Sequence, residues 1–312
     1  LALADLMTSS ASTSDSPEEL SPSDSPPTFG QMEVARVLEM LAALGPIARL
    51  LLCLQDERAH TACWVASLGA AHADAIGASR AATDAALAAR GAAAAYEATL
   101  SRLRDSADRD VGAALACPAV VGVAYYGCLS GFTELIDNVQ AELGSFSICA
   151  ATATFSGFSS LLGVVTHLAA TVAGVLLLPD AALPAVRAKL RADVVISLHR
   201  RKAFSRAIRH RAPRGLLSLL SAGMEMSPSL ARTLSSLEAR CSLSSLRGSV
   251  SPAGWWEVVT AHVDVLRRLQ ATMLGECELT ARRRAATLER PPVVSDLDRP
   301  ILSGCSSPSS AA

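Results

Sequence analysis

The amino-acid sequence predicts an all-α fold, and more specifically a helical membrane protein in which a hydrophobic helical hairpin is flanked by amphipathic helices. Half of the 312 residues are hydrophobic but only 4% are aromatic. The apolar content is therefore mostly Ala, Leu and Val, which favours helices over β-sandwiches. Two long runs carry no charge. Charge is also segregated along the chain: the net charge is −1, but the C-terminal part from residue 181 onward is strongly basic and the rest is acidic.

Composition divides the chain into five parts. The N-terminal segment contains Ser-Pro repeats such as "SPEELSPSDSPP" and lacks the apolar content needed for a packed core. The predicted parts are a disordered acidic Ser/Pro-rich tail (1–29), amphipathic and Ala-rich helices (30–110), a hydrophobic membrane hairpin (111–180), a basic amphipathic helical region (181–290) and a second disordered tail (291–312).

The first folded segment has apolar residues at helical spacing, with a probable kink site at Gly45-Pro46. If this helix is surface-active, its apolar face inserts into a membrane; core packing is the alternative. The predicted membrane-insertion residues are Val34, Val37, Leu38 and Leu41. The Ala-rich stretch 62–104 then predicts one long helix, with Gly91 as its weakest point.

The two uncharged runs are long enough to cross a bilayer. The run 111–133 has 23 residues, which is about 34 Å of helix against a hydrocarbon core of about 30 Å. The run 143–179 must bend, and Gly157 is the expected place, leaving 160–178 as the best spanning segment. Small residues spaced by four let helices approach closely and support self-association. The predicted helix-packing residues are Gly127, Gly131, Ala170 and Gly174.

A basic segment follows the second run directly. Because Lys and Arg collect on the cytosolic side of spanning helices, both termini are expected in the cytosol, with the protein in an organelle membrane. The segment keeps a helical apolar stripe, so its basic residues could lie on anionic lipid headgroups. The predicted headgroup residues are Arg187, Arg191, Arg200, Arg201, Lys202, Arg206 and Arg209. A solvated helix face is the plainer alternative, and no nucleic-acid partner is predicted because no aromatic residues interleave with the charges.

No motif indicates catalysis. The six histidines are isolated from one another, the eight cysteines show no C-x-x-C spacing, and "GFSSL" lacks the second Gly of a nucleophile elbow. The sequence predicts no catalytic residue, no metal ligand and no cofactor, and hence no enzyme. His167 is the exception that invites a function, because it is an ionisable residue within the second uncharged run. A proton or substrate contact and a neutral, hydrogen-bonded ring are both open.

The segment "YYGCLSGFTELIDNVQAELGSFS" resembles the peroxin-eleven family of peroxisomal membrane-elongation proteins. The resemblance covers residues 31–180, where an aromatic and Leu-rich segment leads into an Asp-Asn pair and then a Gly. The residues that carry it are Tyr125, Tyr126, Leu135, Asp137, Asn138 and Gly144. It implies a peroxisomal protein that elongates the organelle before division, through an inserted helix and self-association.

These observations predict a membrane-shaping or scaffolding protein. Its expected partners are anionic membrane lipids and further copies of itself. The first alternative is a soluble helical-bundle adaptor or complex subunit, in which both apolar runs form core helices. The second is a small transporter or channel component that uses His167.

Overall fold

The computed structural model describes residues 29–91, 94–145, 150–240, 248 and 250–288. Throughout these residues the regular elements are helices and none is a strand, which confirms the all-α prediction. Apart from Phe29, which begins the first helix, the two tails predicted to be disordered lie outside the described residues.

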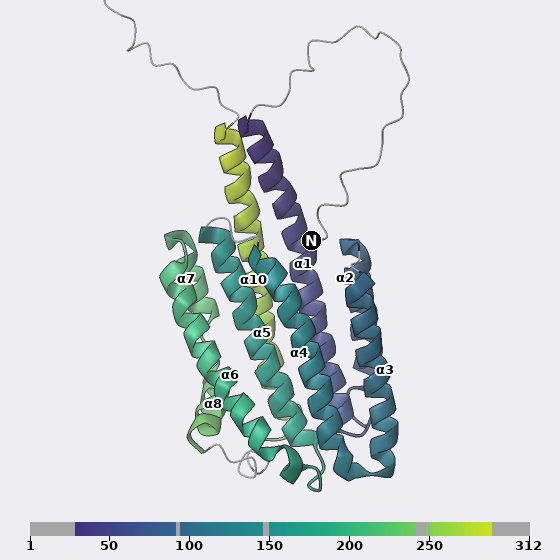
Figure 1. The fold of residues 1–312 in the computed structure, drawn as a ribbon. Coiled ribbons are helices and arrows are strands. Elements are labelled where there is room, and N and C mark those ends of the chain that lie inside the picture. Colours follow the sequence, from purple (N-terminus) through teal and green to yellow (C-terminus); the bar gives the residue numbers. More distant parts are fainter. Residues whose placement is uncertain (1–28, 92–93, 146–149, 241–247, 249, 289–312) are drawn as a thin grey trace, which may run out of the picture.

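Long helices run up and down the molecule, and each reverses the direction of the one before it until α6 (Figure 1). The elements are α1 (Phe29–Ala66), α2 (Ala73–Arg90), α3 (Ala94–Ala116), the 3-10 turn η1 (Pro118–Val120), α4 (Val121–Ser145), α5 (Ala150–Leu177), α6 (Leu183–Arg211), α7 (Arg214–Gly223), α8 (Pro228–Arg240) and α10 (Pro252–Leu288).

Local sequence sets where these helices begin and end. The Ser251 hydroxyl accepts a hydrogen bond from the Gly254 N–H at 3.0 Å, and Ser227 caps α8 in the same way. The long helix predicted for 62–104 is wrong, because the chain breaks twice. It turns between α1 and α2, where Leu68 and His72 both adopt positive φ, and again at Gly91, whose φ of 72° suits a residue without a side chain.

Helices α1, α4, α5 and α10 make up the centre of the bundle (Figure 1). α1 packs against α2, α4, α5 and α10, and α5 packs against α1, α4, α6 and α10. The α2–α3 pair covers one side, and α6 with α7 and α8 covers the other (Figure 1). The largest apolar cluster joins residues of α1, α4, α5 and α10, so the core lies along the shared axis of these four helices.

The two uncharged runs behave differently. The first is not one helix: α3 ends at Ala116, and Pro118 opens η1, so the run turns a corner and α4 starts afresh at Val121. The second run contains α5. Two helical stretches, Ala35–Ala66 and Ala151–Leu177, are long and apolar enough to cross a membrane. In the second, 72% of the most apolar window is buried within the bundle.

The small-residue positions mostly pack within the chain. A side chain at Gly131 would collide with Leu103 of α3, and one at Gly174 would collide with the ring of Tyr125 of α4. Ala170 is fully buried in the cluster that contains Tyr125. Gly127 is exposed, and a Cβ added there would meet nothing within 4 Å. Three of these four residues therefore bring helices of one chain together.

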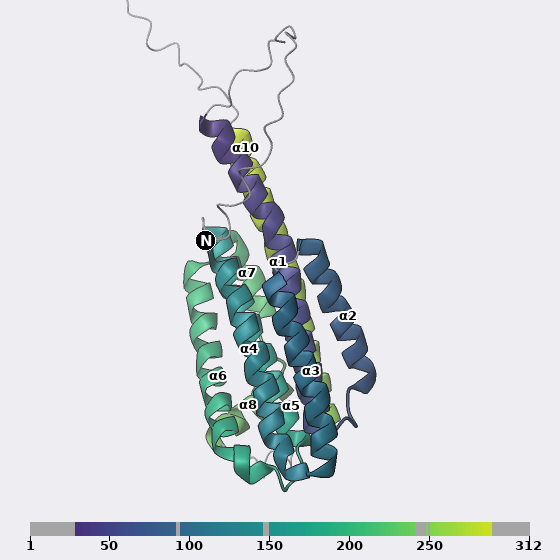
Figure 2. The same cartoon turned by 45° about the vertical axis from the view of Figure 1, so that its right-hand side comes forward.

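The N-terminal part of α1 and the C-terminal part of α10 project together beyond the other helices (Figure 2). They lie side by side where Gly45 faces Leu274, and lower down Arg267 of α10 forms an ion pair with Asp56 of α1. The first and last described helices thus leave the bundle at the same end.

Candidate functional site

Arg58 occupies a core position on α1. It continues the apolar stripe of Ile47, Leu51 and Leu54 at helical spacing, so packing α1 into the bundle carries its side chain inside. Only 1% of Arg58 is exposed. A buried arginine needs hydrogen-bond partners and an opposite charge to offset its desolvation.

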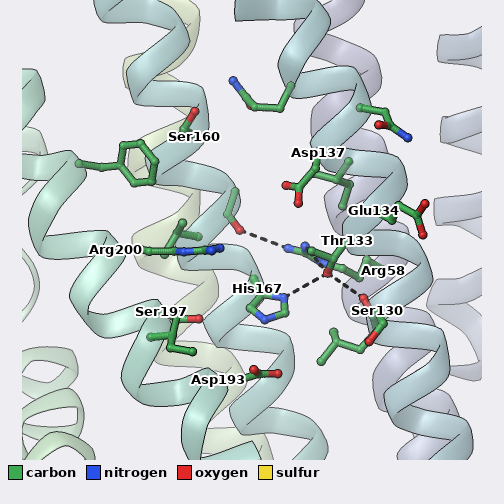
Figure 3. Close-up of a pocket in the computed structure, with 18 of the residues that line it drawn as sticks. Arg58, Ser130, Thr133, Glu134, Asp137, Ser160, His167, Asp193, Ser197 and Arg200 are labelled. Carbon is green, nitrogen blue, oxygen red and sulfur yellow. Dashed lines mark hydrogen bonds between the residues drawn. The ribbon is translucent and has the colours of Figure 1, made fainter. Parts of the chain in front are cut away.

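Neutral groups of two other helices supply the hydrogen bonds. Nη2 of Arg58 donates to the Gly163 carbonyl at 3.2 Å and to the Thr166 hydroxyl at 3.1 Å, both on α5. Nη1 donates to the Thr133 hydroxyl of α4 at 3.5 Å. The guanidinium is therefore held where α1, α4 and α5 meet (Figure 3). Nε has no hydrogen-bond partner.

The positive charge of Arg58 is not matched within the described part of the chain, where no carboxylate lies within ion-pair distance of it. Burial lowers the pKa of Arg58 to about 10, and the more distant Asp137 carboxylate opposes that shift. Because a pKa of about 10 leaves the group protonated at neutral pH, a desolvated cation stands here without a counter-ion. An anionic ligand would complete the site.

A cavity of about 840 Å³ opens beside Arg58, between α4, α5 and α6. Figure 3 shows Arg58 at its inner end and Arg200 of α6 reaching in from the opposite side. The other labelled polar residues that line it are Ser130, Thr133, Glu134, Asp137, Ser160, His167, Asp193 and Ser197. The wall is thus rich in hydroxyl groups around one deep cation.

His167 lines this cavity, with Nδ1 lying 3.5 Å from the Thr133 hydroxyl oxygen. Burial lowers its pKa to about 3, and the charges of Arg58 and Arg200 act in the same direction. The ring is therefore neutral at physiological pH and adds no second positive charge. Among the residues singled out from the sequence, His167 is the one that lies deepest in this site.

Charges of both signs line the outer part of the cavity. Glu134 and Asp137 project from α4, while Lys189, Asp193 and Arg200 project from α6. The Lys189 ammonium lies 3.4 Å from the centre of the Tyr126 ring. Burial raises the pKa of Asp193, against the effect of Arg200. Three carboxylates thus face two cations in the outer part of the cavity, and Arg58 is the cation buried at its inner end.

The predicted headgroup residues are not gathered on one surface. Arg200 points into the cavity, and Arg201 is half-buried and lines a small pocket with His262. Arg191, Lys202, Arg206 and Arg209 are exposed on α6, and the side chain of Arg187 is not among those described. The apolar stripe predicted for this helix is buried, as expected for a packing face.

The predicted insertion residues all belong to α1. Leu38 is 41% exposed and Val37 packs partly against the main core. The side chains of Val34 and Leu41 are not among those described. None of the four is near the cavity lining, which begins further along α1 at Arg58.

The described helices form an all-α bundle with a cavity beside a buried cation, Arg58, that pairs with no described carboxylate. Among protein-family models, the one for nitrate and nitrite sensing (NIT) matches residues 49–278, well over half of the chain. The chain belongs to the NIT family. Arg58, the other cavity residues and nearly all of the helical core lie within the matched region.

A solved structure, described as that of the NasR transcription antiterminator, shares the fold. The TM-score is 0.57 at 16% sequence identity, and the match covers 83% of this chain and 78% of that one. A search of curated proteins gave no match. At this level of identity the similarity concerns the fold, and it spans most of both chains.

Family membership overturns the resemblance to the peroxin-eleven proteins and the functions that followed from it. The residues that carried the resemblance all lie on α4, where Tyr125 is a core residue and Asp137 and Asn138 line the cavity. Membrane shaping, peroxisome elongation and the alternative adaptor and transporter functions are therefore wrong. The predicted set of partners, namely anionic lipids and further copies without nucleic acid, does not fit these findings: the family is one of nitrate and nitrite sensing, and the similar solved structure is that of a transcription antiterminator.

The signal for Arg58 was available in the sequence but was missed. In "LLLCLQDERAH", a group of polar residues interrupts a strongly apolar helix. Arg58 falls four residues after Leu54 and seven after Leu51, which places it on the buried face. A charged residue on the apolar stripe of a helix predicts a buried site more directly than a basic patch does.

Proposed function

We propose that this domain is a sensor that binds nitrate or nitrite in the cavity, with Arg58 as the principal anion-binding residue. The observation that carries the proposal is the buried, protonated guanidinium without a counter-ion. A small monoanion at its free Nε would supply the missing negative charge and accept a hydrogen bond from a group that now has none.

The neutral surroundings suit a singly charged ligand. Thr133 and Thr166 hold the guanidinium through hydroxyl groups, and His167 contributes no charge at neutral pH. The role is recognition without chemistry: these groups orient an anion, and none of them is proposed to form or break a bond.

The test measures binding of nitrate and nitrite to the purified chain by calorimetry and by ligand-induced thermal stabilisation. Arg58→Met is expected to weaken binding more than about a hundredfold, since the buried positive charge and its charge-assisted hydrogen bond both disappear. Arg36→Met, on the exposed N-terminal part of α1, is the control and should bind as the wild type does. If the wild-type chain showed neither heat of binding nor stabilisation by either anion, the proposed function would be rejected.

We also propose that α5 serves as the core helix of this sensor and not as a membrane span. Its most apolar window is largely buried, and it contributes the Gly163 carbonyl and the Thr166 hydroxyl to Arg58. Lipid around α5 would have to replace the helices that now pack on it. Alkaline carbonate extraction of cells expressing the described domain, residues 29–288, should release it into the supernatant; retention in the pellet would contradict this role for α5.

A further inference from the structure

Gln55 lies one helical turn before Arg58 on α1 and is the least satisfied buried polar residue near it. Its exposure is 0%, and neither its Nε2 nor its Oε1 has a hydrogen-bond partner. Leaving a buried amide unpaired costs free energy, so such a group calls for an explanation such as a missing ligand. As placed, Nε2 of Gln55 carries two N–H donors, and neither has an acceptor among the described residues.

Gln55 and Arg58 both meet α5 at Gly163. The Gly163 carbonyl accepts a hydrogen bond from Arg58, and a Cβ added to Gly163 would lie 3.2 Å from Nε2 of Gln55. A larger residue here would press on the amide, so the glycine permits its close approach. Gly163 also lines the cavity. The unpaired amide of Gln55 and the guanidinium of Arg58 therefore both lie beside Gly163, a residue of the cavity wall.

A second buried glutamine shows why the kind of unpaired atom matters. Nε2 of Gln270, on α10, donates to the Ser159 hydroxyl at 2.7 Å, and only Oε1 is left without a partner. An unpaired acceptor repels an anion, whereas an unpaired donor can bind one. Oε1 is unpaired in both residues, but Nε2 is unpaired only in Gln55.

We propose that Gln55 is a second anion-binding residue, which donates a hydrogen bond to an oxygen of the oxoanion held by Arg58. This inference rests on the proposed function and extends it. Arg58 supplies the charge, and Gln55 supplies a directional neutral donor. Two donors from one helix face suit a flat oxoanion, which presents several oxygen acceptors, better than a spherical halide, and Gln55 thus contributes to selectivity.

The experiment uses Gln55→Leu, which removes the amide but keeps a side chain of similar bulk. Because the substitution deletes two unpaired polar atoms, the ligand-free protein should become more stable, with its thermal midpoint rising by about 2 to 6 °C. Nitrate affinity should fall by about tenfold to a hundredfold, as expected for losing a hydrogen bond to a charged ligand. The ratio of nitrate affinity to chloride affinity should also fall.

Gln270→Leu is the matched control, since it makes the same chemical change to another buried glutamine. Ser159 keeps a partner in this variant because its hydroxyl donates to the Phe155 carbonyl at 3.0 Å. Nitrate affinity should stay within about twofold of the wild-type value, below the free-energy equivalent of one hydrogen bond. Gln55→Glu is a second variant: its carboxylate gives Arg58 an internal counter-ion, so nitrate binding should be lost even if Gln55→Leu does not fold.

The outcomes separate the two proposals. Wild-type binding that Arg58→Met abolishes, with Gln55→Leu and Gln55→Glu binding nitrate as tightly as the wild type, would overturn the role of Gln55 and leave the sensor function standing. No nitrate binding by the wild type would overturn the sensor function, and the role of Gln55 with it. Weakened binding together with higher ligand-free stability in Gln55→Leu supports both.

Discussion

Glu57 and Arg58 are neighbours on α1, but the molecule treats their charges in opposite ways. Glu57 is fully buried, and both of its oxygens accept hydrogen bonds from Arg104 of α3, at 2.7 and 2.9 Å. Asp84 of α2 contacts the same arginine. Arg58 faces the other side of α1 and meets only neutral groups.

The contrast separates a charge that holds the fold together from one that is left for a ligand. Glu57 and Arg104 join α1 to the α2–α3 pair, and the chain itself supplies both partners. At Arg58 the described chain supplies the cation but no carboxylate to pair with it. A buried charge with an internal counter-ion contributes to structure, and one without it marks a binding site.

Glu57→Gln should therefore damage the fold and not the site. It removes the charge that faces Arg104, and we expect a loss of about 2 to 4 kcal/mol in the free energy of unfolding, moderated by the remaining contact with Asp84. Urea unfolding followed by circular dichroism would measure this loss. Arg58→Met should show the reverse pattern in the same assay, with stability unchanged or higher and anion binding lost. Equal stability losses in the two variants would remove the distinction between the two charges.

Two glycines, one on α5 and one on α4, also differ in whether the fold depends on them, here because of the space around them. Gly174→Ala places a methyl group against the rigid, buried ring of Tyr125, whose hydroxyl donates to the Ala170 and Thr171 carbonyls. We expect a loss of about 1 to 3 kcal/mol in thermal or urea unfolding. Gly127→Ala, in open space on α4, should be neutral or stabilise by up to about 1 kcal/mol through helix propensity. If Gly174→Ala left the free energy of unfolding unchanged, the packing of Tyr125 against α5 would be loose.

A smaller effect is expected in the dependence of the free energy of unfolding on acidic pH, through His167 in the cavity. His167 has a lowered pKa in the folded chain, so the unfolded chain binds its proton first as the pH falls. Its contribution to stability is complete above about pH 6.5 and is lost as the pH drops toward its folded pKa of about 3. His167→Gln should thus reduce the loss of stability between pH 7 and pH 5 by about 1 to 2 kcal/mol. Urea unfolding at the two pH values measures it, and identical losses in both proteins would place His167 in a more solvated setting.

The smallest expected effect is the pH dependence of nitrate binding. Between about pH 6.5 and pH 9, Arg58 stays protonated and His167 stays neutral, so affinity should change by less than about twofold. Above about pH 10 Arg58 loses its proton and binding should weaken. Calorimetric titrations across this range check it; a steep change near pH 7 would mean that another group carries the charge of the site.

Sequence reasoning recovered the helical class because Ala and Leu content and helical periodicity are local properties. The starts of α8 and α10 are local in the same sense, since Ser227 and Ser251, each followed by Pro, form caps that need no tertiary information. The surroundings of the uncharged runs could not be predicted for a physical reason: a protein interior and a lipid bilayer both exclude charge. Which of them surrounds α5 depends on the helices that pack there, and these come from distant parts of the sequence.

The candidate site was harder to predict than the fold. Arg58 belongs to α1, Thr133 to α4, and Gly163, Thr166 and His167 to α5, and no short motif links them. His167 stood out because it is ionisable within an apolar run. Arg58 is likewise ionisable within an apolar helix. The dense positive charge further along the chain instead predicted a binding surface on α6, where most of the arginines are exposed.

α1 and α10 extend together past the rest of the bundle, so the first and last described helices leave it at one end. α1 carries Gln55 and Arg58 and is about 57 Å long at 1.5 Å per residue, so it spans the distance from the ligand to that end as one rod. A tilt of a few degrees at the cavity would displace its tip by several ångströms relative to α10. If the proposed ion tilted α1 in this way, the helix would act as a lever that carries the movement away from the cavity.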